Sequence, residues 1–273
     1  MVTRQYGQME VGIYDSSAAV GRAAAKDLAQ ILRRAIAERG EAAIIVATGN
    51  SQLTFMEALR GESGIAWDRV SIFHMDEYLG MPEEHPASFR RFNREKLADP
   101  VQARRFYGIR GDADDVEAEM ERYAQLLAEH RPVACVLGIG ENGHLAFNDP
   151  PADFAVERTM MPVTLAESAR RQQVGEGHFA TLADVPTQAL TLTIPALLAP
   201  PYILGVVPEA RKAEAVQQAL EGPVTTGCPA SILRTRSNVR LYLDRDSASR
   251  LEGIAQTLSE DTLQNDFGVR NVS

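Results

Sequence analysis

One glycine-rich stretch of the chain carries side chains that could transfer protons. It runs from Val136 to Pro151 (VLGIGENGHLAFNDPP) and combines three glycines with acids, amides and a histidine. His144 can give or take a proton near neutral pH, and Asp149 follows closely enough in the chain to orient its imidazole ring. A turn needs neither so many glycines nor a histidine, so the stretch predicts an acid–base site. A histidine with a purely structural role is the alternative.

A second candidate is the acidic pair Asp76-Glu77, which comes soon after the apolar run Val70–His74 (VSIFH). Such a run predicts a buried strand, so at least one carboxylate would lie at the edge of the sheet. Partial loss of water there raises a carboxyl pKa towards the range that suits a general base. A solvated turn is the alternative.

The turn Thr48-Gly49-Asn50-Ser51 lies between the apolar run Ala42–Ala47 and a helical stretch. Its glycine allows close approach, and the following helix offers free N–H groups, so the turn suits a phosphate. An ordinary capped turn is the alternative, because the turn is neither a Walker A loop nor G-x-G-x-x-G.

Other chemistries find less support. The chain has no H-E-x-x-H or C-x-x-C pair, and its remaining histidines are scattered without ligand spacing, so we expect no metal. It also lacks the G-x-S-x-G elbow of a serine hydrolase.

The elements that must position these groups alternate along the chain. Residues 15–40 and Asp115–His130 have helical spacing, as does Glu209–Leu220, whereas Val133–Gly138 and Tyr202–Val207 are short apolar runs typical of buried strands. This alternation predicts an α/β fold: a doubly wound, mostly parallel sheet with helices on both faces, Rossmann-like and three-layered. No linker-like segment interrupts the 273 residues, so we expect a single domain over 1–273.

Composition excludes several partners. Lys plus Arg number 28 and Asp plus Glu 37, so the net charge of −9 argues against nucleic acid. An anionic ligand would need a locally positive pocket. The chain has only two cysteines and no signal-peptide pattern, and nowhere do 18 apolar residues run together, so we expect a cytoplasmic protein with no membrane contact.

Together these motifs resemble the glucosamine-6-phosphate deaminase (isomerase) family. The resemblance rests on Met75-Asp76-Glu77-Tyr78, on Glu84-His85-Pro86-x-Ser88 and on Gly138 to Asn148 (GIGENGHLAFN), and it extends from about Ala42 to Asp244. The related 6-phosphogluconolactonases typically have D-E-R in place of Asp76-Glu77-Tyr78. The deaminase is therefore the nearer relative.

The resemblance implies conversion of glucosamine 6-phosphate and water into fructose 6-phosphate and ammonia, with no metal or redox cofactor. It implies that His144 opens the sugar ring, that Asp76 moves a proton between C2 and C1, and that Asn142 and Asp149 flank and tune the histidine. It further implies that Lys212 binds the phosphate. The matched motifs add these substrate-binding candidates: Thr48, Gly49, Asn50, Ser51, Glu77, Tyr78 and Gly143.

Some positions depart from the family pattern. Asn142 stands where many members have Asp, and Asp149 where they have Glu. An arginine that some members use for phosphate falls near Gln173 in an ungapped count, with Arg170 and Arg171 just before it. We expect one of these, taken as Arg171, to replace it, although both could be ordinary exposed arginines.

Two other functions stay open. One is a 6-phosphogluconolactonase-type hydrolase, in which a histidine activates water and no second carboxylate is needed. The other is a non-catalytic sugar-phosphate sensor, which the absence of a basic DNA-binding segment disfavours. A homo-oligomer is compatible with the sequence.

Overall fold

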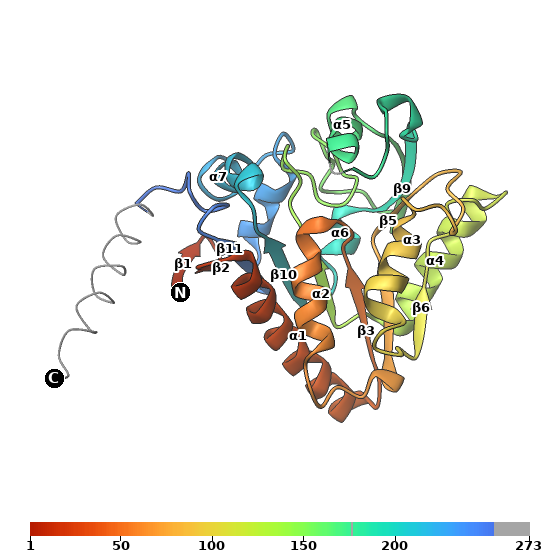
Figure 1. Cartoon of the computed structure of the whole chain (residues 1–273), viewed down its shortest axis with the longest axis horizontal. Helices are drawn as coiled ribbons and strands as arrows, with labels where there is room; N and C mark the ends of the chain where they lie inside the picture. The colour runs from red at the N-terminus through yellow and green to blue at the C-terminus, as the bar shows by residue number, and fades with distance from the viewer. Residues whose placement is uncertain (176, 254–273) are drawn as a thin grey trace.

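The computed structural model describes residues 1–175 and 177–253, and its centre is a twisted sheet (Figure 1). Within these residues the sheet has eight strands in the order β1-β2-β11-β10-β7-β3-β4-β6. All neighbours pair in parallel except β1 and β2, which are antiparallel. The strands are β1 (Val2–Tyr6), β2 (Met9–Tyr14), β3 (Ala42–Val46), β4 (Val70–His74), β6 (Arg105–Tyr107), β7 (Ala134–Leu137), β10 (Tyr202–Val207) and β11 (Val239–Asp244).

Helices cover both faces of this sheet. The helices are α1 (Ser17–Arg39), α2 (Leu53–Arg60), α3 (Phe89–Asn93), α4 (Val116–His130), α5 (Glu167–Gly175), α6 (Ile194–Leu197) and α7 (Ala213–Glu221). Shorter 3₁₀ segments lie at Asn50–Gln52, Trp67–Arg69, Leu182–Asp184, Ala210–Lys212 and Pro229–Thr235, and a π-helical turn at Arg94–Ala98.

The apolar runs of the sequence become strands because both of their faces are buried. In β3, Ile44 and Val46 pack in the cluster that contains α1 and α2, whereas Ala43 and Ile45 pack in the cluster that contains α4, α6 and α7. A strand covered on both sides has no solvent face to leave polar. The three-layer, mostly parallel α/β fold is therefore confirmed.

The predicted helix over residues 15–40 is α1. The Ser16 side chain caps its first turn by accepting from the Ala19 N–H, and Gly40 ends it in the left-handed conformation (φ 81°). Asp115 caps α4 in the same way by accepting from Ala118. These local signals explain why both helices begin where the sequence predicts.

A second sheet, small and antiparallel, was not predicted. It has the order β5-β9-β8, from β5 (Asp76–Tyr78), β8 (Met160–Thr164) and β9 (Gln188–Leu192). Asp76 pairs with Thr191, so the acidic pair lies on a buried strand and not in the solvated turn that was the alternative. Three residues are too few to show an alternating pattern, and their pairing partner lies far along the chain.

The small sheet and α5 lie beyond the carboxyl end of β4 and its parallel neighbours, at the top of Figure 1. In doubly wound folds this edge of the sheet is where ligands bind. Among the described residues, no helix combines the length and apolar composition needed to cross a membrane.

Candidate active site

A pocket opens at this edge of the sheet, with about 620 Å³ of empty space that includes its mouth. Its lining comes from the turn after β3, the start of β5, the glycine-rich loop after β7 and the segment after β10, and also from α3, α5 and the turn after α5. The predicted residues in its wall are Thr48, Gly49, Ser51, Asp76, His144 and Lys212. The fold thus brings together groups that the sequence places at successive strand ends.

His144 is held by a chain of polar contacts. Its Nδ1 lies 3.2 Å from Oδ1 of Asp149, and the Asn142 amide donates to the same oxygen at 2.9 Å. The Asn142 side-chain oxygen in turn accepts from the His144 N–H at 3.2 Å. Asn142 and Asp149 do not line the pocket; they support the histidine from behind.

These contacts keep Asp149 ionised. Burial alone would raise its pKa, but hydrogen bonds from His144 and Asn142 and from the Ala166 N–H outweigh that effect and lower the pKa. An ionised Asp149 favours a proton on Nδ1 of His144, which leaves Nε2 as the nitrogen that can exchange protons with a ligand.

Asp76 is buried, with 6% of its surface exposed, yet its side chain reaches the pocket. Burial raises its pKa well above the usual value, and the charge of Glu77 raises it further. The neighbouring His74 stays neutral, because burial and the charge of Arg90 lower its pKa to about 3. A carboxyl group in such a setting is a stronger base than an exposed one once it ionises.

The turn after β3 and the segment after β10 both supply polar groups to the pocket. Gly49 has a φ of 126°, which a residue with a side chain rarely adopts, and the chain then enters the 3₁₀ turn Asn50–Gln52. Lys212, with only 4% exposure, lines the same pocket. A buried cation and the backbone N–H groups of a turn that line one pocket can hold an anion on a protein of net charge −9.

Five predicted binding residues lie outside the lining of this pocket. Asn50 is exposed, and Gly143 shapes the loop behind His144 with a φ of 83°. Glu77 is fully buried and binds backbone N–H groups of α3, while Tyr78 packs against aromatic rings. Arg171 is exposed, and its Nε donates to Glu167 at 2.8 Å.

Helix α5 and the turn after it nevertheless contribute to the pocket, through side chains that were not predicted to bind a ligand. Gln172, Gln173 and His178 line the wall, whereas Arg170 donates to the carbonyl of Val185 at 2.9 Å. The two arginines thus belong to a helix that lines the pocket, but neither of them is part of the lining. Gln52, Phe89 and Phe147 also line the pocket. They were not predicted as binding residues, because an apolar or amide side chain does not indicate by its type that it contacts a ligand.

In the part of the chain that the structure describes, no group of three or more His, Cys, Asp or Glu side chains is placed to hold a metal ion. Both cysteines, Cys135 and Cys228, are buried thiols outside any disulfide.

The doubly wound fold, with His144 and Asp76 in one pocket at the carboxyl edge of the sheet, defines the class of the protein as an α/β enzyme. Residues 15–242 match the family described as glucosamine-6-phosphate isomerases/6-phosphogluconolactonase, and the chain belongs to that family. It is 36% identical over 228 residues to a glucosamine-6-phosphate deaminase of Exiguobacterium sibiricum, a match that covers 83% of this chain and 88% of the relative.

Solved structures agree on the fold. A structure of a monomeric glucosamine-6-phosphate deaminase superposes with a TM-score of 0.79 at 29% identity, over 88% of this chain and 98% of the other. A 6-phosphogluconolactonase from Shewanella baltica superposes with a TM-score of 0.72 at 22% identity, over 86% of this chain and 97% of the other. The second likeness concerns the fold alone.

Proposed function

We propose that this protein converts glucosamine 6-phosphate and water into fructose 6-phosphate and ammonia. One observation carries the proposal: a buried Asp76, whose pKa is raised, faces the same pocket as His144. An aldose–ketose isomerisation needs two such groups, one to open the sugar ring and one to move a proton between neighbouring carbons. The glucosamine-6-phosphate deaminases among the relatives point to the same substrate.

The phosphate of the substrate binds where Lys212 and the turn Thr48–Ser51 line the pocket. Lys212 supplies the positive charge, and the turn Thr48–Ser51 supplies a hydroxyl from Thr48 and backbone N–H groups. Because Lys212 is largely removed from water, its attraction for a phosphate dianion is stronger than that of a surface lysine.

His144 and Asp76 then act in sequence. His144 takes the proton of the C1 hydroxyl and gives a proton to the ring oxygen, so that the C1–O5 bond breaks and C1 becomes an aldehyde. Asp76 removes the proton from C2 while a proton passes from the C2 ammonium to the C1 oxygen, which gives an enolamine. Asp76 then returns its proton to C1. The resulting iminium at C2 adds water and releases ammonia, leaving the ketone of fructose 6-phosphate. Asp149 stabilises the imidazolium form of His144 during these steps.

The test is to incubate the purified protein with glucosamine 6-phosphate and to measure ammonia and ketose together. Release of both supports the proposal, whereas binding without either product would leave a sugar-phosphate sensor. The same protein is assayed on 6-phosphogluconolactone. Asp76→Asn separates the two enzymes, because it should abolish deamination but spare a lactonase, in which His144 alone activates water.

The phosphorylated substrate and the two unpaired cysteines also fit the cytoplasmic location that the sequence predicts.

A further inference from the structure

Asn93, the last residue of α3, contacts the proposed phosphate-binding turn from behind. Its side chain is fully buried, and its Nδ2 lies 2.8 Å from Oγ1 of Thr48 and 3.0 Å from the carbonyl oxygen of Phe89. Thr48 and Phe89 both line the pocket, whereas Asn93 does not. The asparagine therefore touches the pocket wall without touching the space in which a ligand would lie.

The Phe89 carbonyl fixes the direction of these hydrogen bonds. A carbonyl oxygen can only accept, so the atom of Asn93 that faces it must be the NH₂ group and not the amide oxygen. The same NH₂ group donates to Thr48, which makes Oγ1 of Thr48 the acceptor in that contact. The hydroxyl hydrogen of Thr48 must then point elsewhere, and Thr48 faces the pocket.

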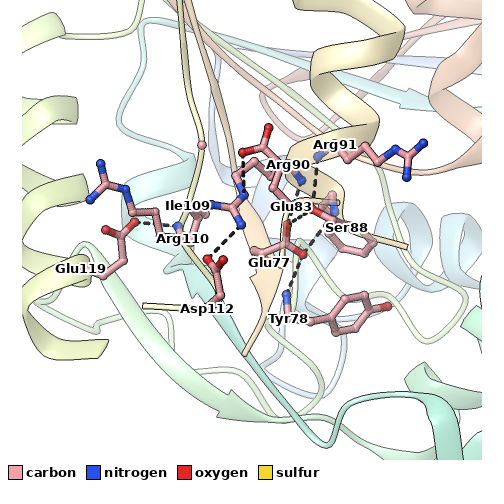
Figure 2. A network of polar contacts seen from close by, with 12 residues as sticks. Glu77, Tyr78, Glu83, Ser88, Arg90, Arg91, Ile109, Arg110, Asp112 and Glu119 are labelled. Carbon is pink, nitrogen blue, oxygen red and sulfur yellow. Dashed lines mark hydrogen bonds and ion pairs between the residues drawn. The ribbon is translucent and has the colours of Figure 1, made fainter. Parts of the chain in front are cut away.

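Helix α3 is itself held by the strand that carries Asp76. Figure 2 shows the carboxylate of Glu77 at the first turn of α3, where it accepts from the Ser88 hydroxyl at 2.8 Å and from the N–H groups of Phe89 and Arg90 at 3.2 and 2.9 Å. A carboxylate that accepts three hydrogen bonds from the start of one helix holds that helix firmly against its own strand. The position of Asn93 is thus tied to that of Asp76.

Ion pairs hold the same helix from its other side. Arg90 is buried, and its guanidinium lies 2.9 Å from Asp112 and 3.6 Å from Glu83 (Figure 2). Because α3 is short, these contacts decide where its last residue lies. Breaking them would displace Asn93 relative to Thr48.

We propose that Asn93 is a positioning residue that directs the hydroxyl hydrogen of Thr48 towards a phosphate oxygen in the pocket, with Glu77 anchoring the helix that carries it. Asn93 acts only through Thr48. The inference rests on the proposed function, in which the turn Thr48–Ser51 binds the phosphate.

The test is a double-mutant cycle on Asn93→Ala and Thr48→Val. Asn93→Ala removes the donor but leaves the hydroxyl, and Thr48→Val removes the hydroxyl at nearly constant volume. For each protein we would measure kcat and KM for glucosamine 6-phosphate, and the dissociation constant of inorganic phosphate by calorimetry. Each single variant should weaken phosphate binding by about twofold to about tenfold, the range of one hydrogen bond, with kcat changed less than twofold.

The double variant tests whether Asn93 acts through Thr48. If Asn93 acts through Thr48, adding Asn93→Ala to Thr48→Val changes phosphate binding less than twofold. Equal effects of Asn93→Ala in both backgrounds, or a loss in kcat with KM unchanged, would overturn the inference. Asn93→Ser replaces Asn93→Ala if the alanine variant does not fold. Asn238→Ala is the control, since this amide donates to the carbonyl of Pro200 and Asn238 does not line the pocket.

The two proposals fail differently. A wild-type protein that binds phosphate but releases no ammonia refutes the deaminase, and the cycle on phosphate binding still tests Asn93. A wild-type protein that releases ammonia while the cycle shows no coupling refutes the role of Asn93 alone.

Discussion

The imidazole of His144 lies directly against the backbone of Gly140. A Cβ at position 140 would lie 2.2 Å from the His144 Nε2 and Cε1 atoms, and the Gly140 N–H donates to the His144 carbonyl at 3.0 Å. No side chain fits in this space. The position of the imidazole therefore requires a glycine at residue 140 of the loop.

Gly140→Ala should consequently displace the imidazole without changing any ionisable group. We expect kcat to fall by about 100-fold or more, the cost of moving a catalytic group by about 1 Å. Gly61→Ala is the matched control, because a Cβ there meets nothing nearer than 3.4 Å. Steady-state kinetics and thermal unfolding of both variants check this. Full activity of Gly140→Ala would show that His144 does not work from this position.

Asp76→Asn should remove activity and at the same time stabilise the protein. The pKa of Asp76 in the folded state is raised above its value in the unfolded state. The free energy of unfolding therefore falls as the pH rises from the unfolded pKa to the folded pKa, and the whole loss is present above both values. An amide of the same shape carries no such cost, so the melting temperature at pH 7 should rise by a few degrees. A lower melting temperature would contradict the raised pKa.

The wild-type pH profile should reflect the same group. A base must be ionised, so kcat/KM should fall as the pH drops through the raised pKa of Asp76, well above the range of an exposed aspartate. Glu77→Gln removes the charge that contributes to this shift and should move the acidic limb to lower pH. A limb that stays in place would show that burial alone sets the pKa.

The sequence predicts the strand-end residues of this site well, and the reason is topological. Thr48, Asp76, His144 and Lys212 each follow an apolar run, and parallel strands bring their carboxyl ends to one edge. The apolar runs and the order of the motifs are enough to predict that these four groups lie together.

The same reasoning fails where position depends on contacts distant in sequence. Glu77 stands beside Asp76 in the sequence, but β5 alternates, so its side chain turns away from the pocket to α3. Gln173 of α5 and His178 of the following turn line the pocket because this segment packs over it, and no local sequence pattern predicts that packing. Amide side chains also occur throughout protein surfaces, so the residue type does not indicate that Gln173 lines a pocket.

Asp149→Asn should keep the geometry around His144 and lose the charge. The amide oxygen can still accept from Nδ1 and from Asn142, but it cannot balance an imidazolium. We expect kcat to fall by about 10- to 100-fold with KM nearly unchanged. Asn142→Ala removes one donor to Asp149 and should have the smaller effect. A rise in KM instead would place Asp149 in substrate binding.

Lys212→Ala should weaken binding and not chemistry. Loss of a charge-assisted hydrogen bond in a buried site corresponds to roughly 10- to 100-fold in KM, and inorganic phosphate should lose affinity in parallel. Lys26→Ala, on the exposed face of α1, is the matched control for loss of one positive charge. Equal effects of the two variants would mean that only the net charge matters.

A last prediction compares Arg171 of α5 with His178 of the turn that follows this helix. His178 lines the pocket, whereas Arg171 is exposed and paired with Glu167. Exposed pairs contribute about 0–1 kcal/mol, so Arg171→Ala should leave KM and kcat within twofold of the wild-type values. His178→Ala should raise KM by about twofold to about tenfold, because a polar contact with the bound ligand is lost. A larger effect of Arg171→Ala on KM would contradict this prediction. It would mean that α5 moves when the ligand binds, so that Arg171 enters the pocket.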